Sequence, residues 1–168
     1  MRIRKVLSLF VALAAAGTVF GADAASDARK AIQGVFSRYA NAWLKLDPKQ
    51  ASTAFRESTT NDYVTVIDGK KVTRSEILAT YSRNMKSISK LLKYSTKIER
   101  LALKGAKCET RTLTEIAGSV LDPEKKPHKL EMLQRSDMVW VKDGGAWKVK
   151  SSKTETLKFH IDGKPVTR

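Results

Sequence analysis

Apolar residues recur every three or four positions in the first third of the chain. The longest such stripe consists of Ile32, Val35, Phe36, Tyr39, Trp43 and Leu46. Because this spacing places side chains on one face of an α-helix, it predicts an amphipathic helix from Ser26 or Asp27, which can cap it, to about Leu46. Asp47 and Pro48 then suit the cap and the first position of a second, short helix.

A strand pair and a third helix are predicted next. Residues 62–67 (DYVTVI) have strong strand propensity, and Asp68-Gly69 is a hairpin signal after which residues 70–72 return as a short strand. Thr73 and Glu76 form a capping-box pattern, which marks a helix start. This helix carries one apolar side, which consists of Ile77, Leu78, Tyr81 and Met85.

The second half of the chain has the pattern of four long strands. We predict them at Tyr94–Leu103, Ala106–Leu121, Lys129–Lys142 and Ala146–His160. Their short connections require an antiparallel meander, and strands of this length need bulges in order to bend. The sequence therefore predicts an α+β fold, in which helices pack on a strongly curved antiparallel sheet and enclose a pocket.

Strict alternation assigns faces to the last two of these strands. In 146–160 it places Glu155 on the same face as Trp147 and Val149. In 129–142 both faces carry apolar residues, so this strand is expected to be covered on both sides. We expect a homodimer that forms through the sheet to supply the second cover.

The first 24 residues have the pattern of a signal peptide. Arg2, Arg4 and Lys5 precede a short, mostly apolar run, and Ala22-Asp23-Ala24 offers small residues for cleavage. The alternative is an uncleaved anchor helix, but the run is shorter than the roughly 20 residues that span a bilayer. We expect residues 1–24 to be removed and 25–168 to form one domain, exported to the periplasm or secreted.

The chain is basic, with 32 Lys and Arg against 17 Asp and Glu, a net charge of +15. The basic residues are scattered and no nucleic-acid-binding motif accompanies them, so no nucleic-acid partner is expected, and only weak contact with anionic cell-envelope surfaces. Cys108 is the single cysteine and the histidines are His128 and His160. Neither a disulfide within the chain, a metal site nor a cofactor is expected.

The order of the predicted elements resembles the nuclear-transport-factor-2-like superfamily (SnoaL-like, ketosteroid-isomerase-like). The residues that carry the resemblance are Arg38-Tyr39, Trp43, Leu46-Asp47, Phe55, Asp62-Tyr63, Asp68-Gly69, Thr73-Arg74, Glu76, Val139-Trp140, Gly144-Gly145 and Trp147-Lys148-Val149. The resemblance implies a cone-shaped α+β fold and is closest to small exported members of unknown activity. The superfamily includes isomerases, dehydratases, cyclases and hydrolases as well as binding domains, so the fold leaves the function open.

The resemblance also identifies one candidate for chemistry. Tyr39 lies where steroid-isomerase relatives carry the tyrosine that binds a developing oxyanion. Those relatives place a general base on the first strand, whereas residues 64–67 here have no ionisable group, and Asp68 is explained by its turn. Isomerase activity of this type is therefore not expected.

Two hypotheses of function remain. The first is an exported domain that binds a small apolar or amphipathic molecule, or a protein, without a catalytic centre. Its expected pocket residues are Tyr39, Trp43, Tyr63, Tyr81, Met85, Met132 and Trp140, which could equally fill a solid core. The alternative is an isomerase-, dehydratase- or hydrolase-like enzyme in which Tyr39 meets a relocated acid, Asp137 or Glu155, in one cavity.

Overall fold

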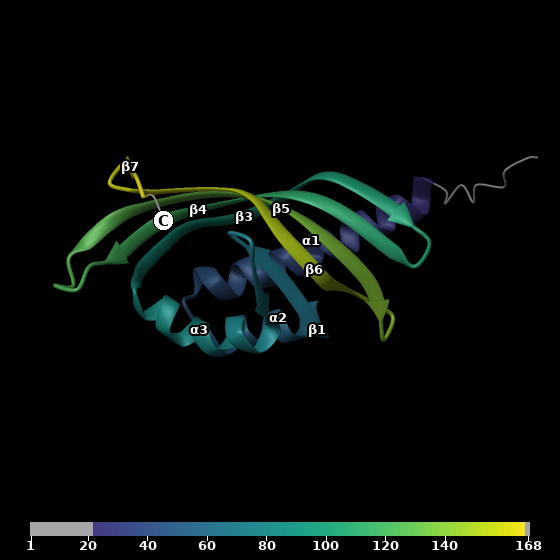
Figure 1. Ribbon diagram of the computed structural model, residues 1–168, viewed down its shortest axis with the longest axis horizontal. Coiled ribbons are helices and arrows are strands. Elements are labelled where there is room, and N and C mark those ends of the chain that lie inside the picture. Colours follow the sequence, from purple (N-terminus) through teal and green to yellow (C-terminus); the bar gives the residue numbers. More distant parts are fainter. Residues whose placement is uncertain (1–21, 167–168) are drawn as a thin grey trace, which may run out of the picture.

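The computed structural model describes residues 22–166, which form three helices and seven strands. Helices and sheet make two layers: the sheet curves over the helices and covers them on one side (Figure 1). The fold is α+β, as predicted, and the sheet is open rather than closed into a barrel. None of the helices within residues 22–166 has the length and hydropathy to cross a membrane. The predicted signal peptide lies outside the described residues except for positions 22–24.

The helices are α1 (Ala22–Leu44), α2 (Pro48–Ser58) and α3 (Arg74–Lys86). The predicted start of the first helix at Ser26 or Asp27 was wrong, because the chain is already helical at Ala22 and neither residue acts as a cap. Its end also falls earlier than predicted. Leu46 adopts a positive φ of 51° in the turn that leads to α2.

The predicted caps of the two shorter helices are confirmed. Asp47 accepts hydrogen bonds from the backbone N–H groups of Lys49 and Gln50, at 2.9 and 3.0 Å. Thr73 and Glu76 form a full capping box, in which the Glu76 carboxylate accepts from the Thr73 N–H at 2.7 Å. Both caps satisfy backbone donors that a helix start leaves unpaired, which explains why these helices begin where they do.

The strands are β1 (Thr59–Ile67), β2 (Lys70–Thr73), β3 (Ile88–Lys104), β4 (Lys107–Leu121), β5 (Pro127–Asp143), β6 (Ala146–Ile161) and β7 (Lys164–Pro165). They are ordered β2-β1-β6-β5-β4-β3, with β7 added to β6. All neighbours are antiparallel except β1 and β6, which run parallel. β3 begins six residues before the predicted Tyr94, because Ile88, Lys90 and Leu91 already pair with β4.

Because β6 contains two bulges, strict alternation assigned part of this strand to the wrong face. Trp140 pairs with Val149 but Val139 pairs with Ser151, so Lys150 is an extra residue. Arg135 pairs with Thr156 and the next residue of β5 pairs with Thr154, so Glu155 is a second extra residue. Each bulge shifts the later residues to the other face.

Trp140 lies at the centre of the core. Its side chain has no solvent exposure, and its ring meets that of Phe36 edge to face at 5.4 Å between centroids. The indole N–H donates to the Thr110 hydroxyl at 2.9 Å, so the one polar atom of the side chain is satisfied. The contact between Trp140 and Phe36 joins α1 to the middle of the sheet.

Cys108 is also fully buried, and burial raises the pKa of its thiol to about 11.

Candidate functional site

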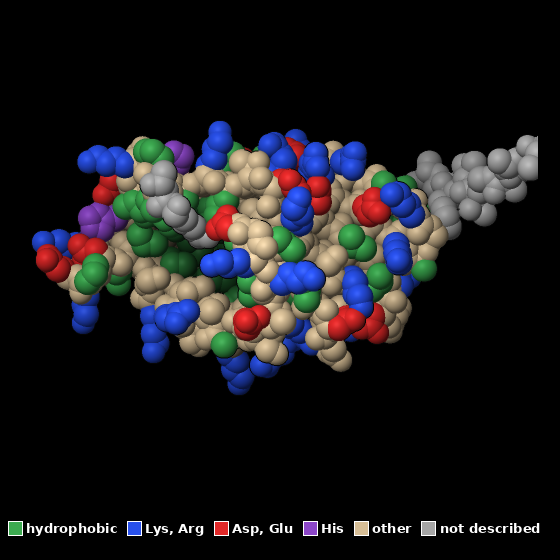
Figure 2. All heavy atoms as spheres, viewed as in Figure 1, with side chains coloured by type: hydrophobic (Ala, Val, Ile, Leu, Met, Phe, Trp, Pro, Cys, Tyr) green, Lys and Arg blue, Asp and Glu red, His purple; other side chains and the backbone are tan. Residues whose placement is uncertain are grey.

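A cavity of about 490 Å³ lies between the helix layer and the concave face of the sheet. The surface is hollowed left of centre in Figure 2, where hydrophobic side chains line a recess, and in Figure 1 α3 and the sheet lie on either side of this region. Such a volume is typical of small-molecule sites. The pattern of apolar residues left a cavity and a filled core as alternatives, and the structure contains a cavity.

The helix side of the cavity is aromatic. Tyr39 and Trp43 of α1, Phe55 of α2 and Tyr81 of α3 converge here, and Tyr94 of β3 joins them. Trp43 meets Tyr81 edge to face at 5.5 Å between centroids and stacks on Tyr94 at 6.0 Å. These rings supply a large apolar surface that needs few torsions to be fixed. The stripe on α1 places Tyr39 and Trp43 one turn apart on the same face, which is why both point into the cavity.

The hydroxyls of Tyr39 and Tyr81 bond to each other. Burial raises the pKa of Tyr39 to about 12, although the hydrogen bond from Tyr81 and the nearby Trp43 indole N–H oppose the shift. Burial, followed by the nearby Tyr39 phenol, raises the pKa of Tyr81 far above its ordinary value. The Trp43 N–H is buried and forms no well-aligned hydrogen bond within the described part of the chain.

The sheet side of the cavity carries neutral polar groups. Tyr63 and Ser152 are joined through their hydroxyls at 2.8 Å, and Ser152 donates to Thr65 at 2.8 Å. Farther across the sheet the hydroxyls of Thr96 and Thr114 are 3.0 Å apart. The cavity therefore has an aromatic side and a hydroxyl-bearing side, a combination that suits an amphipathic molecule.

The cavity is almost free of charge. Of the described residues that line it, none is Lys, Arg or His, and Glu76 is the one acid. The Glu76 carboxylate is already engaged with the side chain and backbone of Thr73, which lower its pKa. No group of three or more His, Cys, Asp or Glu residues within 22–166 is arranged to hold a metal ion. The described lining therefore offers donors and acceptors but no free general base.

The pH at which the four tyrosines of the chain ionise tests how their side chains pack around the cavity. Burial raises the pKa of Tyr39, Tyr63, Tyr81 and Tyr94. In the unfolded chain these phenols ionise near pH 10. We therefore expect little tyrosinate absorbance at 295 nm near pH 10 in the folded protein, and about half of the full absorbance at that pH in denaturant, where the phenols are half ionised. Because the folded pKa values are the higher ones, stability is fully present below pH 10 and falls as the pH rises above it. A folded protein that titrates all four near pH 10 would contradict the buried cluster.

The expected pocket residues divide into two groups. Tyr39, Trp43, Tyr63, Tyr81 and Trp140 line the cavity. Met85 is buried in the core, and Met132 is half-buried on β5; neither contributes to the lining.

The structure does not bring Asp137 and Glu155 to Tyr39. Both acids lie on the outer face of the sheet, away from the helices. Asp137 forms two hydrogen bonds with the Arg111 guanidinium, at 2.8 and 2.7 Å, and Glu155 forms an ion pair with Lys153 at 2.9 Å. The expected convergence with Tyr39 was wrong. For Glu155 the reason is the β6 bulge at Lys150, which ends the alternation that linked it to Val149.

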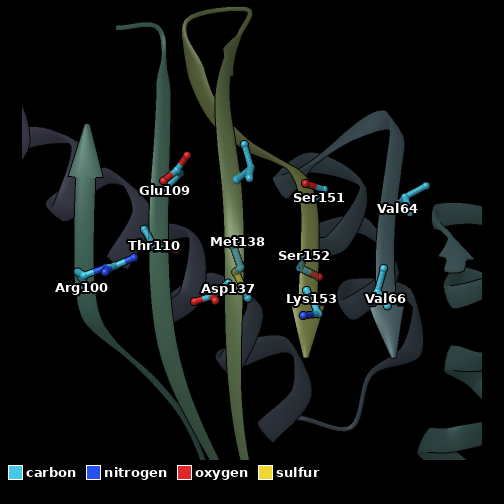
Figure 3. Close-up of a pocket in the computed structure, with 11 residues that line it drawn as sticks. Val64, Val66, Arg100, Glu109, Thr110, Asp137, Met138, Ser151, Ser152 and Lys153 are labelled. Atoms are coloured by element: carbon cyan, nitrogen blue, oxygen red, sulfur yellow. The ribbon is translucent and has the colours of Figure 1, made fainter. Parts of the chain in front are cut away.

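The outer face carries a separate groove of about 340 Å³. Figure 3 shows Val64 and Val66 of β1, Ser151 of β6 and Asp137 of β5 along it. Four charged residues line it. Glu109, Asp137 and Lys153 are held in ion pairs with Lys104, Arg111 and Glu155 respectively, and the fourth is Arg100. The groove is smaller than the cavity.

Several residues that line the cavity were not identified from the sequence. Gln134 has the same parity on β5 as Met138 and Trp140, so alternation alone could have found it. Tyr94, Ser152 and Thr154 could not be placed in this way. β3 has bulges between Leu91 and Lys93 and between Ile98 and Arg100, and β6 has its own, so counting along these strands loses the face.

Comparison with known proteins supports the fold. No protein-family model matches the chain, and no curated protein matches its sequence. A conserved protein from Planctomyces limnophilus superposes with a TM-score of 0.64 at 19% identity, over 84% of this chain and 99% of the other. A type 2 hexachlorocyclohexane dehydrochlorinase (LinA) gives 0.62 at 12% identity, over 84% and 90%.

A nuclear transport factor 2-like superfamily protein from Salmonella enterica serovar Typhimurium gives a TM-score of 0.58 at 15% identity, over 77% of this chain and 91% of the other. The superpositions cover at least 77% of this chain and at least 90% of each of these structures. The chain therefore has the nuclear-transport-factor-2-like fold, as its sequence predicted. Because identities of this size establish the fold alone, the function must be inferred from the cavity.

Proposed function

We propose that the protein is an exported domain that binds a neutral, apolar or amphipathic small molecule in the concave cavity and has no catalytic centre. The observation that carries this proposal is the nearly uncharged lining, in which four tyrosines and several hydroxyls surround about 490 Å³ and Glu76 is the one charged group among the described residues that line it. Apolar walls with a few fixed polar groups are typical of sites for small molecules.

Tyr39 is the residue that we assign to the polar end of the ligand. Either hydroxyl of the Tyr39–Tyr81 pair can be the donor, and we assign that role to Tyr81, which leaves the proton of Tyr39 to donate to a carbonyl or hydroxyl of the ligand. With a pKa of about 12, this phenol stays protonated across the physiological range. It can thus act as a hydrogen-bond donor throughout that range.

The alternative is an enzyme of the same fold. The dehydrochlorinase among the similar structures favours it, since it shows that the fold can host an enzyme. Against it stands the position of Asp137 and Glu155 on the outer face, paired with Arg111 and Lys153. Glu76 is the one remaining acid of the described lining, and its capping hydrogen bonds would have to break before it could take a proton.

Binding of N-phenyl-1-naphthylamine, a neutral fluorescent probe, tests the proposal. We expect saturable binding of one molecule per chain, with energy transfer from Trp43 and Trp140, which line the cavity. Thr154→Phe inserts a ring into the cavity and should weaken binding at least tenfold, because the ring takes the volume that the probe needs. Fluorescence titration measures both.

Thr156→Phe is the matched control for this experiment. Thr156 lies on the same strand but pairs with Arg135 and is exposed outside the lining. The control should bind the probe like the unchanged protein. Absence of saturable binding, or equal affinity in both variants, would contradict the proposal.

Export is tested by the mature N-terminus. If residues 1–24 act as a signal peptide, N-terminal sequencing of the protein recovered from the periplasm or the medium should begin at Ala25. Retention in the cytoplasm with residues 1–24 intact would sink this part of the proposal.

A further inference from the structure

Gln134 is the one carboxamide that the described strands contribute to the lining of the cavity; the other carboxamide of the described lining, Asn84, lies on α3. Gln134 lies on β5, where it pairs with Thr114 of β4 and Leu157 of β6. Its neighbours in the lining are hydroxyl-bearing or apolar, so the amide is the strongest neutral dipole on the sheet side.

The orientation of the Gln134 amide is fixed by two hydrogen bonds. Its Nε2 donates to the Ser136 hydroxyl at 2.9 Å and to the Thr154 hydroxyl at 3.3 Å, which uses both of its N–H groups. The carbonyl oxygen Oε1 has no hydrogen-bond partner among residues 22–166 and is not one of their buried unpaired atoms, so it is accessible from the cavity. The structure therefore holds an acceptor in place and leaves it unpaired.

No hydroxyl of the described lining donates a hydrogen bond to Oε1 of Gln134. Thr96 and Thr114 bond to each other. Thr59 and Thr80 donate to the backbone carbonyls of Phe55 and Ile77, at 2.6 and 2.8 Å. An acceptor that is left unpaired on desolvation costs free energy, so a bound molecule must supply a donor of its own.

We propose that Gln134 selects, among neutral ring molecules, those that carry a hydroxyl or N–H group, which donates to its Oε1 atom. This inference rests on the proposed binding function and assigns the ligand class. Anionic analogues are rejected despite the net charge of +15, because the described lining contains no cation to pair with them.

Three small probes of the same shape separate these requirements. 4-Propylphenol is neutral and carries a donor, 4-propylanisole replaces the O–H by a methyl ether, and 4-propylbenzoate is an anion. We expect the phenol to bind about tenfold more tightly than the anisole, the value of one well-placed hydrogen bond. The benzoate should bind more weakly than the anisole. Isothermal titration calorimetry measures all three.

Gln134→Met removes the acceptor at nearly constant volume. In this variant the affinity for 4-propylphenol should fall to that for 4-propylanisole, while the anisole affinity stays unchanged and shows that the cavity is intact. Gln50→Met, the same substitution at an exposed position of α2, should keep the tenfold preference.

The outcomes distinguish the two proposals. Equal affinity for phenol and anisole in the unchanged protein, a phenol preference that survives Gln134→Met, or tighter binding of the benzoate would overturn the role of Gln134. If none of the three probes binds, the proposed binding function itself fails.

Discussion

Trp140→Ala is expected to lower the free energy of unfolding by about 4 kcal/mol, the usual cost of deleting a fully buried aromatic side chain. Trp140 has no solvent exposure, packs edge to face on Phe36 and lies between α1 and the sheet. Its loss also leaves the buried Thr110 hydroxyl without the indole donor that it accepts from at 2.9 Å. Urea denaturation followed by circular dichroism measures the change.

Trp140→Phe separates the two contributions. It retains a ring against Phe36 but removes the N–H, so we expect a smaller loss of about 2 kcal/mol from the unpaired Thr110 hydroxyl and the reduced volume. A loss below about 1 kcal/mol for Trp140→Ala would contradict the placement of this side chain at the centre of the core.

Gly118→Ala should lower the free energy of unfolding by about 3 kcal/mol. A Cβ at position 118 would lie 2.2 Å from the backbone oxygen of Lys90 and 3.1 Å from Cα of Leu91. These are backbone atoms of the adjacent strand β3, so they cannot rotate away as a side chain could. The strands would have to separate beside the bulge at Leu92, whose side chain is 66% exposed. Thermal and urea unfolding measure the loss.

Gly34→Ala is the control for this prediction and should have the opposite sign. Gly34 lies inside α1, where a Cβ would meet only the Arg38 side chain at 3.8 Å. The better helix propensity of alanine should stabilise the protein by about 0.5 to 1 kcal/mol. Equal effects of the two substitutions would show that β3 and β4 do not approach each other as closely as the structure has them.

The parts of the fold that depend on local sequence could be predicted. The stripe on α1 determines which face is buried, Asp47 and Thr73 determine where α2 and α3 start, and Asp68-Gly69 determines the first hairpin. Each of these signals acts over a few residues, so its outcome depends little on the rest of the chain. The aromatic side of the cavity follows from the same stripe, since Tyr39 and Trp43 project from α1.

The sheet side of the cavity could not be predicted in the same way. Which face a strand residue occupies depends on every bulge before it, and bulges arise from pairing with distant strands. Lys150 is such a residue: it leaves the ladder and pairs with Asp62 on β1, and it thereby turns Ser152 and Thr154 into the cavity. Strict alternation instead directed attention to Glu155, which lies on the outer face.

The position of a bound probe tests the central claim, that the concave cavity is the binding site, most directly. Intermolecular NOEs between N-phenyl-1-naphthylamine and the methyl groups of the labelled protein can separate the two faces of the sheet. We predict NOEs to Ile67, Ile77 and Val149, which line the cavity. NOEs to Val64, Val66 and Val139, which line the outer groove, without any to the first three, would contradict it.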